Sequence, residues 1–195
     1  MTTDTLFTMI CYMIVCSFTP GPGNILSLNT MTKYDWKDGK RVIAGVCCGY
    51  LVVQYICTFA VFGLNEVLAP ALHILKYVGG VYMMWLAYHI VVSKPQTELD
   101  EKKPTFRSGF FLQLVNVKIY FYITSLLSVY YVPYIKKLSL LLAAGVGAVA
   151  IGSMASFTWA FLGLKIQKVY NKYYRPINIV LGLFLVYCAW NIVRS

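Results

Sequence analysis

The chain has 195 residues, of which 59% are hydrophobic and only 12% are charged, and its formal net charge is +10. An ordinary soluble domain carries about a quarter charged residues, so this composition excludes a water-soluble fold and predicts an all-α integral membrane protein. The basic residues fall in short groups between apolar runs rather than on one polar face. This pattern excludes a nucleic-acid partner and makes the lipid bilayer the expected surroundings.

Six apolar runs are each long enough to cross a bilayer, which takes about 20 residues, and in lipid such runs must be helical. The predicted transmembrane helices cover residues 6–31, 42–63, 71–92, 109–132, 138–163 and 176–193. One hydrophilic segment divides this single transmembrane domain into repeat 1 (about 1–93), a loop (94–107) and repeat 2 (about 108–195). Since each repeat has three crossings, the two repeats are expected to be inverted relative to each other.

The first span is interrupted near its middle by the run Thr19, Pro20, Gly21, Pro22, Gly23 and Asn24. Proline removes a backbone donor and glycine adopts conformations that other residues avoid, so about one unwound turn is predicted. An unwound turn at membrane depth is tolerated only where it faces protein or a water-filled cavity. We therefore interpret this run as a functional break rather than a packing kink.

The second span contains Gly45 and Gly49, which form a GxxxG pattern. Such a pattern allows another helix to approach closely. Whether that helix belongs to the same chain or to a second subunit is left open.

The fourth span carries Gln113, Asn116 and Lys118 in an apolar background. If the helix starts near Ser108, Lys118 lies about 15 Å inside, at a rise of 1.5 Å per residue. A charge at that depth costs at least about 2.5 kcal/mol, which favours a functional role. The alternative is a lysine whose side chain snorkels to the interface.

The loops differ strongly in positive charge. Twelve Lys and Arg residues follow the first, third and fifth spans, and three lie on the opposite side of the membrane. Because the side richer in Lys and Arg is normally cytoplasmic, both termini are predicted to face outward from the inner membrane.

All seven acidic residues lie outside the apolar spans. A transporter of metal cations would need carboxylate, histidine or thiolate clusters inside the spans, so no metal and no cofactor are expected. The six cysteines form no CxxC pair, and buried cysteine usually acts as a small hydrophobic residue. With no nucleophile–base constellation either, an enzyme is not predicted.

Several segments resemble the LysE/RhtB family of amino-acid exporters. FTPGPGN at residues 18–24 is similar to the family's PGPN motif, and YVGGVY at 77–82 follows in order. LVNVK at 114–118 is similar to the start of the second repeat, where the family usually has Asn-Pro-Lys. Gly23 stands where the family commonly has its first Asn. Val117 replaces the usual Pro, so the fourth helix is expected to be less broken than in relatives.

The resemblance implies a secondary transporter that exports a small amino acid or a close derivative, driven by the proton gradient or the membrane potential. The absence of carboxylates from the spans favours neutral amino acids. A transmembrane thiol-disulfide electron conduit is the alternative, and a homodimer is left open. The candidate substrate-binding residues are Thr19, Pro20, Gly21, Pro22, Gly23, Asn24, Asn116 and Lys118.

Within this site, Lys118 and the backbone amides that follow Gly23 are expected to meet the substrate carboxylate. The freed carbonyls near the break and the side-chain amide of Asn116 are expected to bind the substrate ammonium.

The charge distribution predicts a topology that labelling can test. Epitope tags on either terminus should be accessible from outside intact cells, and a tag in the loop at 94–107 only after the membrane is permeabilised. Labelling of a C-terminal tag from the cytoplasmic side alone would contradict the orientation.

Overall fold

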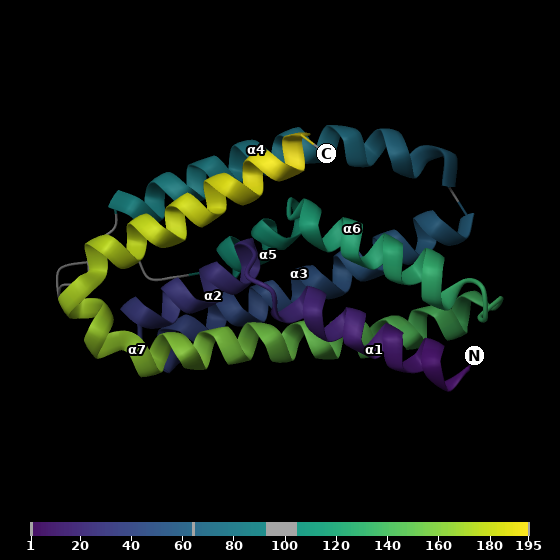
Figure 1. Cartoon of the computed structure of the whole chain (residues 1–195), viewed down its shortest axis with the longest axis horizontal. Coiled ribbons are helices and arrows are strands. Elements are labelled where there is room, and N and C mark those ends of the chain that lie inside the picture. Colours follow the sequence, from purple (N-terminus) through teal and green to yellow (C-terminus); the bar gives the residue numbers. More distant parts are fainter. Residues whose placement is uncertain (1, 64, 93–104, 195) are drawn as a thin grey trace.

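The computed structural model describes residues 2–63, 65–92 and 105–194, in which every regular element is a helix (Figure 1). The predicted all-α fold is therefore confirmed. Most of the predicted loop at 94–107 lies outside the described residues. The elements are α1 (Thr3–Phe18), α2 (Pro22–Lys33), α3 (Trp36–Gly63), α4 (Asn65–Val92), α5 (Phe106–Leu114), α6 (Val117–Ser125), the π-helix η1 (Leu126–Tyr131) and α7 (Leu138–Arg194).

The helices have the length and surface of membrane helices. Among the described residues, α3 and the stretch Leu138–Tyr187 of α7 are long and apolar enough to cross a membrane, and each of two bent helix pairs has the same character if taken as one span. Large apolar side chains point outward, with Phe7 69% and Val81 73% exposed. Such surfaces are rare on soluble monomers and suit contact with lipid.

The predicted break in the first span is confirmed. Helix α1 ends at Phe18, α2 begins at Pro22, and the two are bent by 48°. Thr19 and Gly21 have extended ψ values of 138° and 172°. Each precedes a proline, which disfavours the helical conformation in the residue before it. Pro22 then occupies the first position of α2, where its missing N–H loses no helical bond.

The fourth span is broken even though Val117 replaces the proline of the family motif. Helix α5 ends at Leu114, the helix resumes at Val117, and the bend is 55°. Asn116 lies between them with φ −81° and ψ 88°, and its backbone N–H bonds to the Gln113 carbonyl. The Asn116 side chain makes no capping bond to α6 and donates instead to Gln113 Oε1 at 2.8 Å. The break therefore forms without a proline.

The predicted loop between the fifth and sixth spans is helical instead. Helix α7 continues through the basic segment and bends at Tyr173, where φ is −123° and ψ is 33°. Pro176 follows three residues later, in the first turn after the bend, where proline is tolerated. The bend turns the second part of α7 back beside α4 (Figure 1).

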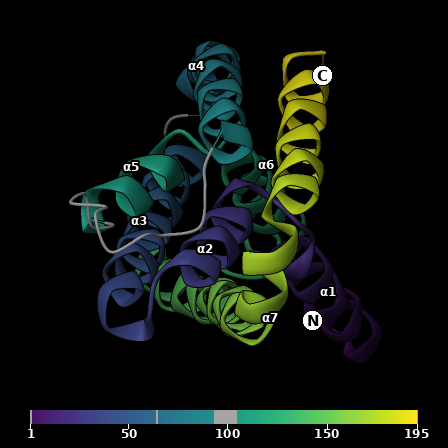
Figure 2. The same ribbon diagram turned by 90° about the vertical axis from the view of Figure 1, so that its left-hand side faces the viewer.

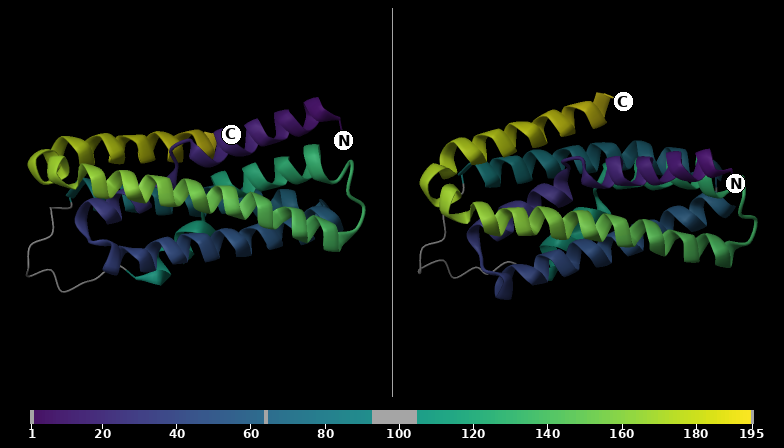
Figure 3. Two further views of the ribbon diagram at one scale, coloured as in Figure 1. Left: turned by 90° about the horizontal axis from the view of Figure 1, so that it is seen from below. Right: turned by 60° about the horizontal axis from the view of Figure 1, so that its bottom comes forward.

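Helix α2 lies in the middle of the bundle. Ten of its twelve residues are buried, and the end-on view shows it surrounded by other helices (Figure 2). It packs on α7 and α3, and α7 also runs beside α3 along the bundle (Figure 3). The part of the first span that follows the break is therefore enclosed by protein.

The GxxxG face of α3 contacts α5 of the same chain. A Cβ atom on Gly45 would collide with the Phe106 carbonyl, and one on Gly109 would collide with the Val42 carbonyl. Gly49 lies against Gln113, whose Cβ would be 2.7 Å from an added methyl group. These glycines therefore bring the backbones of α3 and α5 together, next to the second break.

This contact predicts a difference between two glycine substitutions. Gly45→Ala should lower the free energy of unfolding by about 1–3 kcal/mol, because it overpacks a backbone contact. Gly147→Ala is the control, since a Cβ there meets nothing within 4 Å, and it should be neutral or stabilising by up to about 1 kcal/mol. Thermal unfolding in detergent measures both. Equal melting temperatures for the two variants would contradict the α3–α5 contact.

Candidate functional site

The break in the first span frees the last carbonyls of α1, and side chains from other elements satisfy them. The Asn24 side-chain amide donates to the carbonyls of Ser17 (2.8 Å) and Thr19 (3.1 Å). The indole N–H of Trp159 on α7 donates to the Phe18 carbonyl at 3.1 Å. The last carbonyls of a helix need such donors because they have no partner within the helix. The unwound turn is thus held open by its surroundings.

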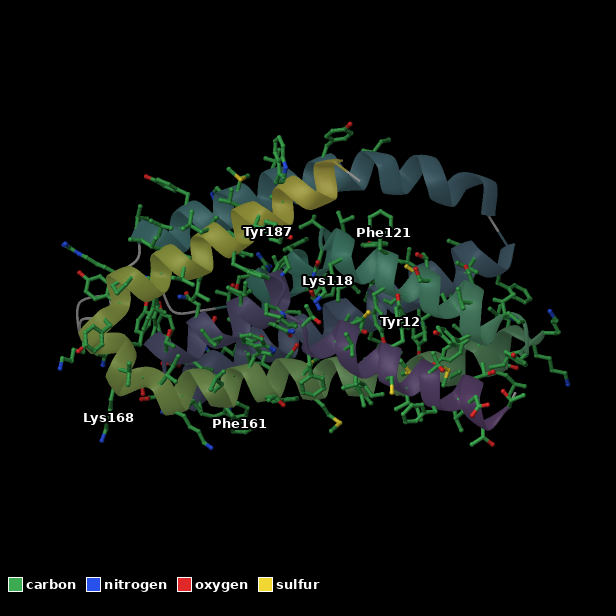
Figure 4. All side chains as sticks on the ribbon, in the orientation of Figure 1. Tyr12, Lys118, Phe121, Phe161, Lys168 and Tyr187 are labelled. Carbon is green, nitrogen blue, oxygen red and sulfur yellow. The ribbon has the colours of Figure 1, made fainter. Side chains whose placement is uncertain are left out.

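Lys118 supplies the third donor. Its ammonium Nζ lies 2.8 Å from the Thr19 carbonyl and 3.4 Å from the Pro20 carbonyl. Its stem passes Gly21 so closely that an added Cβ would lie 2.9 Å from the Lys118 Cδ. Figure 4 shows Lys118 near the middle of the bundle, between the broken first span and α6. A charge from the second break therefore neutralises the carbonyl end of the first.

The second break lies against the first. The Asn116 side-chain N–H donates to Gln113 Oε1 at 2.8 Å, and both side chains are buried. A Cβ on Gly23 would lie 2.9 Å from that same Oε1, so a larger residue at position 23 would require the Gln113 side-chain amide to shift. The Asn116 Oδ1 has no hydrogen-bond partner among the described residues. It remains as an acceptor beside the break.

A cavity of about 20 Å³ lies where the two breaks meet. It has room for a water-sized molecule but not for an amino acid, so any larger ligand requires side chains or helices to move. Among the described residues, Lys118 is the one charged side chain in its wall. The wall is formed by Cys16, Ser17, Gly21, Gly23, Asn24, Tyr50, Gln113, Asn116, Lys118, Ile119, Gly152 and Ser156.

The structure brings all eight sequence-predicted residues to this region, in different roles. Five line the cavity, and the carbonyls of Thr19 and Pro20 accept from Lys118. The Thr19 hydroxyl turns away and donates to the Val15 carbonyl. Pro22 is buried at the first position of α2. The five that line the cavity are Gly21, Gly23, Asn24, Asn116 and Lys118.

Other contributors were missed from the sequence. Trp159 carries no sequence signal, because aromatic residues are common in membrane helices and its partner is 141 residues away. Ser17 lies on α1 and Tyr50 on α3. A polar group in an apolar run was the only sequence signal that could have indicated their place at the cavity. No group of three or more His, Cys, Asp or Glu that could hold a metal occurs in the part of the chain that the structure describes.

Comparison with known proteins finds relatives along the whole chain. The family profile described as LysE type translocator matches residues 14–195. Proteins named "Cysteine/O-acetylserine efflux protein" from Escherichia coli (strain K12) and Shigella sonnei (strain Ss046) are each 36% identical over 190 residues, 97% of this chain and 97% of theirs. No solved structure matches.

The indole contact predicts a stability change at the first break. Trp159→Phe removes the N–H that binds the Phe18 carbonyl, and leaving that carbonyl unsatisfied should lower the free energy of unfolding by about 1–3 kcal/mol. Trp190→Phe is the matched control, because Trp190 is 64% exposed on the same helix. Thermal unfolding in detergent compares them. An equal loss in both variants would show that the indole contact does not stabilise the break.

Proposed function

Because the chain belongs to the LysE type translocator family, we propose that it is a secondary transporter that exports a small amino acid or a close derivative from the cytoplasm. The family resemblance inferred from the sequence is confirmed by this match. Relatives named as cysteine/O-acetylserine efflux proteins favour a small, polar, neutral amino acid as the substrate. The protein is a multi-pass membrane transporter rather than an enzyme.

The proposed architecture is six transmembrane helices in two inverted repeats, at about 1–93 and 108–195. Two observations support it. The broken helices, α1–α2 and α5–α6, occupy corresponding first positions in the two halves. The bend at Tyr173 divides α7 into two parts, the fifth and sixth spans of this scheme. Both termini would face outward from the inner membrane, and a homodimer remains open.

The contact of Lys118 with the Thr19 and Pro20 carbonyls carries the proposed mechanism. The Lys118 ammonium is chemically the same group as the ammonium of a free amino acid. It occupies the carbonyls that the sequence analysis assigned to the substrate ammonium. We expect the substrate ammonium to replace it there, with the unpartnered Asn116 Oδ1 as a further acceptor.

The displaced Lys118 ammonium then meets the substrate carboxylate. The start of α2 lies at the same place, and Gly21 at its N-cap offers no side chain to cap it. The positive end of that helix favours a carboxylate. A zwitterionic amino acid therefore exchanges one ammonium–carbonyl contact for another and adds a counter-ion for Lys118. No charge is left buried without a partner, which a membrane interior penalises.

This exchange also couples substrate binding to movement. The cavity is too small for an amino acid, so binding must separate the two breaks. When the substrate leaves, the Lys118 ammonium again donates to the Thr19 and Pro20 carbonyls, and the empty carrier can return to its starting conformation. Rocking of the two repeats, driven by the proton gradient or the membrane potential, would give alternating access.

The alternative of a thiol-disulfide electron conduit gains no support. Cys11, Cys16, Cys47, Cys48 and Cys57 are free, and they lie on α1 and α3. The matched relatives are named as efflux proteins.

The test is substrate flux from proteoliposomes containing the purified protein. The wild-type protein should transport cysteine or O-acetylserine. Lys118→Gln and Lys118→Ala should reduce this flux by about 30-fold or more, because they remove the charge that pairs with the substrate carboxylate in the proposed mechanism. Lys118→Arg keeps the charge with a different geometry and should be partly active.

Lys136→Gln is the matched control, because Lys136 is exposed and donates only to the Val132 carbonyl of its own turn. It should transport at the wild-type rate. Wild-type flux in Lys118→Ala would reduce Lys118 to a structural anchor. Absence of flux for every amino acid in the wild-type protein would contradict the export function itself.

A further inference from the structure

Three buried hydroxyl groups from three helices meet beside the cavity. They belong to Ser17 on α1, Tyr50 on α3 and Tyr122 on α6, with exposed fractions of 9%, 2% and 4%. Ser17 and Tyr50 line the cavity. The three groups lie within interacting range of one another, yet none of the three oxygens has a hydrogen-bond partner of normal geometry among the described residues.

The ring of Tyr50 packs against Gly152 of α7. A Cβ atom on Gly152 would collide with the Tyr50 ring, so the ring occupies space that only glycine leaves. Buried polar groups are normally hydrogen-bonded. A phenylalanine in the same place would avoid the free-energy cost of an unpartnered hydroxyl. Two unpartnered hydroxyls at the cavity wall, with the Tyr122 hydroxyl in interacting range of both, therefore indicate a ligand that supplies the partners.

The chemistry of this wall indicates which part of a ligand it takes. Hydroxyls are neutral and act both as donors and as acceptors. The neighbouring wall residues Cys16, Ser156 and Ile119 are also uncharged. The charged and carbonyl groups lie at the two breaks, where the ammonium and carboxylate of an amino acid find their partners. The part of the wall that carries the Ser17 and Tyr50 hydroxyls therefore suits the short side chain of the ligand.

We infer that Ser17, Tyr50 and Tyr122 form a side-chain subsite that selects amino acids whose short side chain can hydrogen-bond, through a hydroxyl, a thiol or an ester. This inference rests on the proposed export function. An apolar side chain of equal size would leave the hydroxyls unpartnered. A site built to hydrogen-bond its substrate rejects such an analogue far more strongly than an apolar pocket rejects a size difference.

The experiment compares size-matched amino acids in proteoliposomes. Serine and cysteine are set against 2-aminobutyrate, which has a methyl group in place of the hydroxyl or thiol. The wild-type protein should transport the polar pair at least about tenfold faster. Tyr50→Phe and Tyr122→Phe each remove one oxygen and should lower that ratio by about tenfold. Ser17→Ala should lower it in the same direction and provides a variant should a tyrosine substitution fail to fold.

Tyr88→Phe is the control, because Tyr88 is 65% exposed on α4, and it should keep the wild-type ratio. A wild-type ratio near one would overturn the subsite. So would a ratio that stays unchanged in the subsite variants, or an equal loss of flux for both kinds of amino acid. These outcomes leave the export function standing, because that function fails only when the wild-type protein transports no amino acid.

Discussion

A helix that ends in the interior of a membrane protein leaves carbonyl groups without donors, and lipid supplies none. Here α1 ends at Phe18, and the carbonyls from Ser17 to Pro20 bond to side chains of α2, α6 and α7. Those side chains must reach one point from distant parts of the chain. The need to satisfy this unwound turn therefore fixes how the helices are arranged around it.

The need to bring these groups together also explains the glycines near the two breaks. Gly21 and Gly23 let Lys118 and Gln113 of the second break approach the first. Gly45 and Gly109 let α3 hold α5 at backbone contact, which places the second break. Close approach is gained where a side chain is absent, because interiors are packed without spare volume. At each of these four glycines, an added Cβ atom would therefore come too close to a specific neighbouring atom.

The chemistry of the site follows from what the breaks supply. One helix end offers carbonyls, one helix start offers amides, and Lys118 supplies a charge that can serve either the protein or a carboxylate. An amino acid carries the complementary pair of charges on one small molecule. In the proposed mechanism, the same geometry lets a carrier without acidic residues in its apolar spans bind a zwitterion without a net buried charge.

The sequence alone determined the membrane class, the break at Pro20 to Pro22 and the presence of a lysine in an apolar span, because these depend on local chemistry: apolar length, missing backbone donors and a charge in an apolar run. It did not determine the 55° bend at Asn116, the continuous helix through the predicted loop before Tyr173, or the role of Trp159. The Trp159 contact depends on groups that lie 141 residues apart in the chain, and neither bend is marked by a local sequence signal as clear as the two prolines of the first break. Only the tertiary structure shows that the Lys118 ammonium donates to the Thr19 carbonyl, because the sequence by itself allows other partners for each of these two groups.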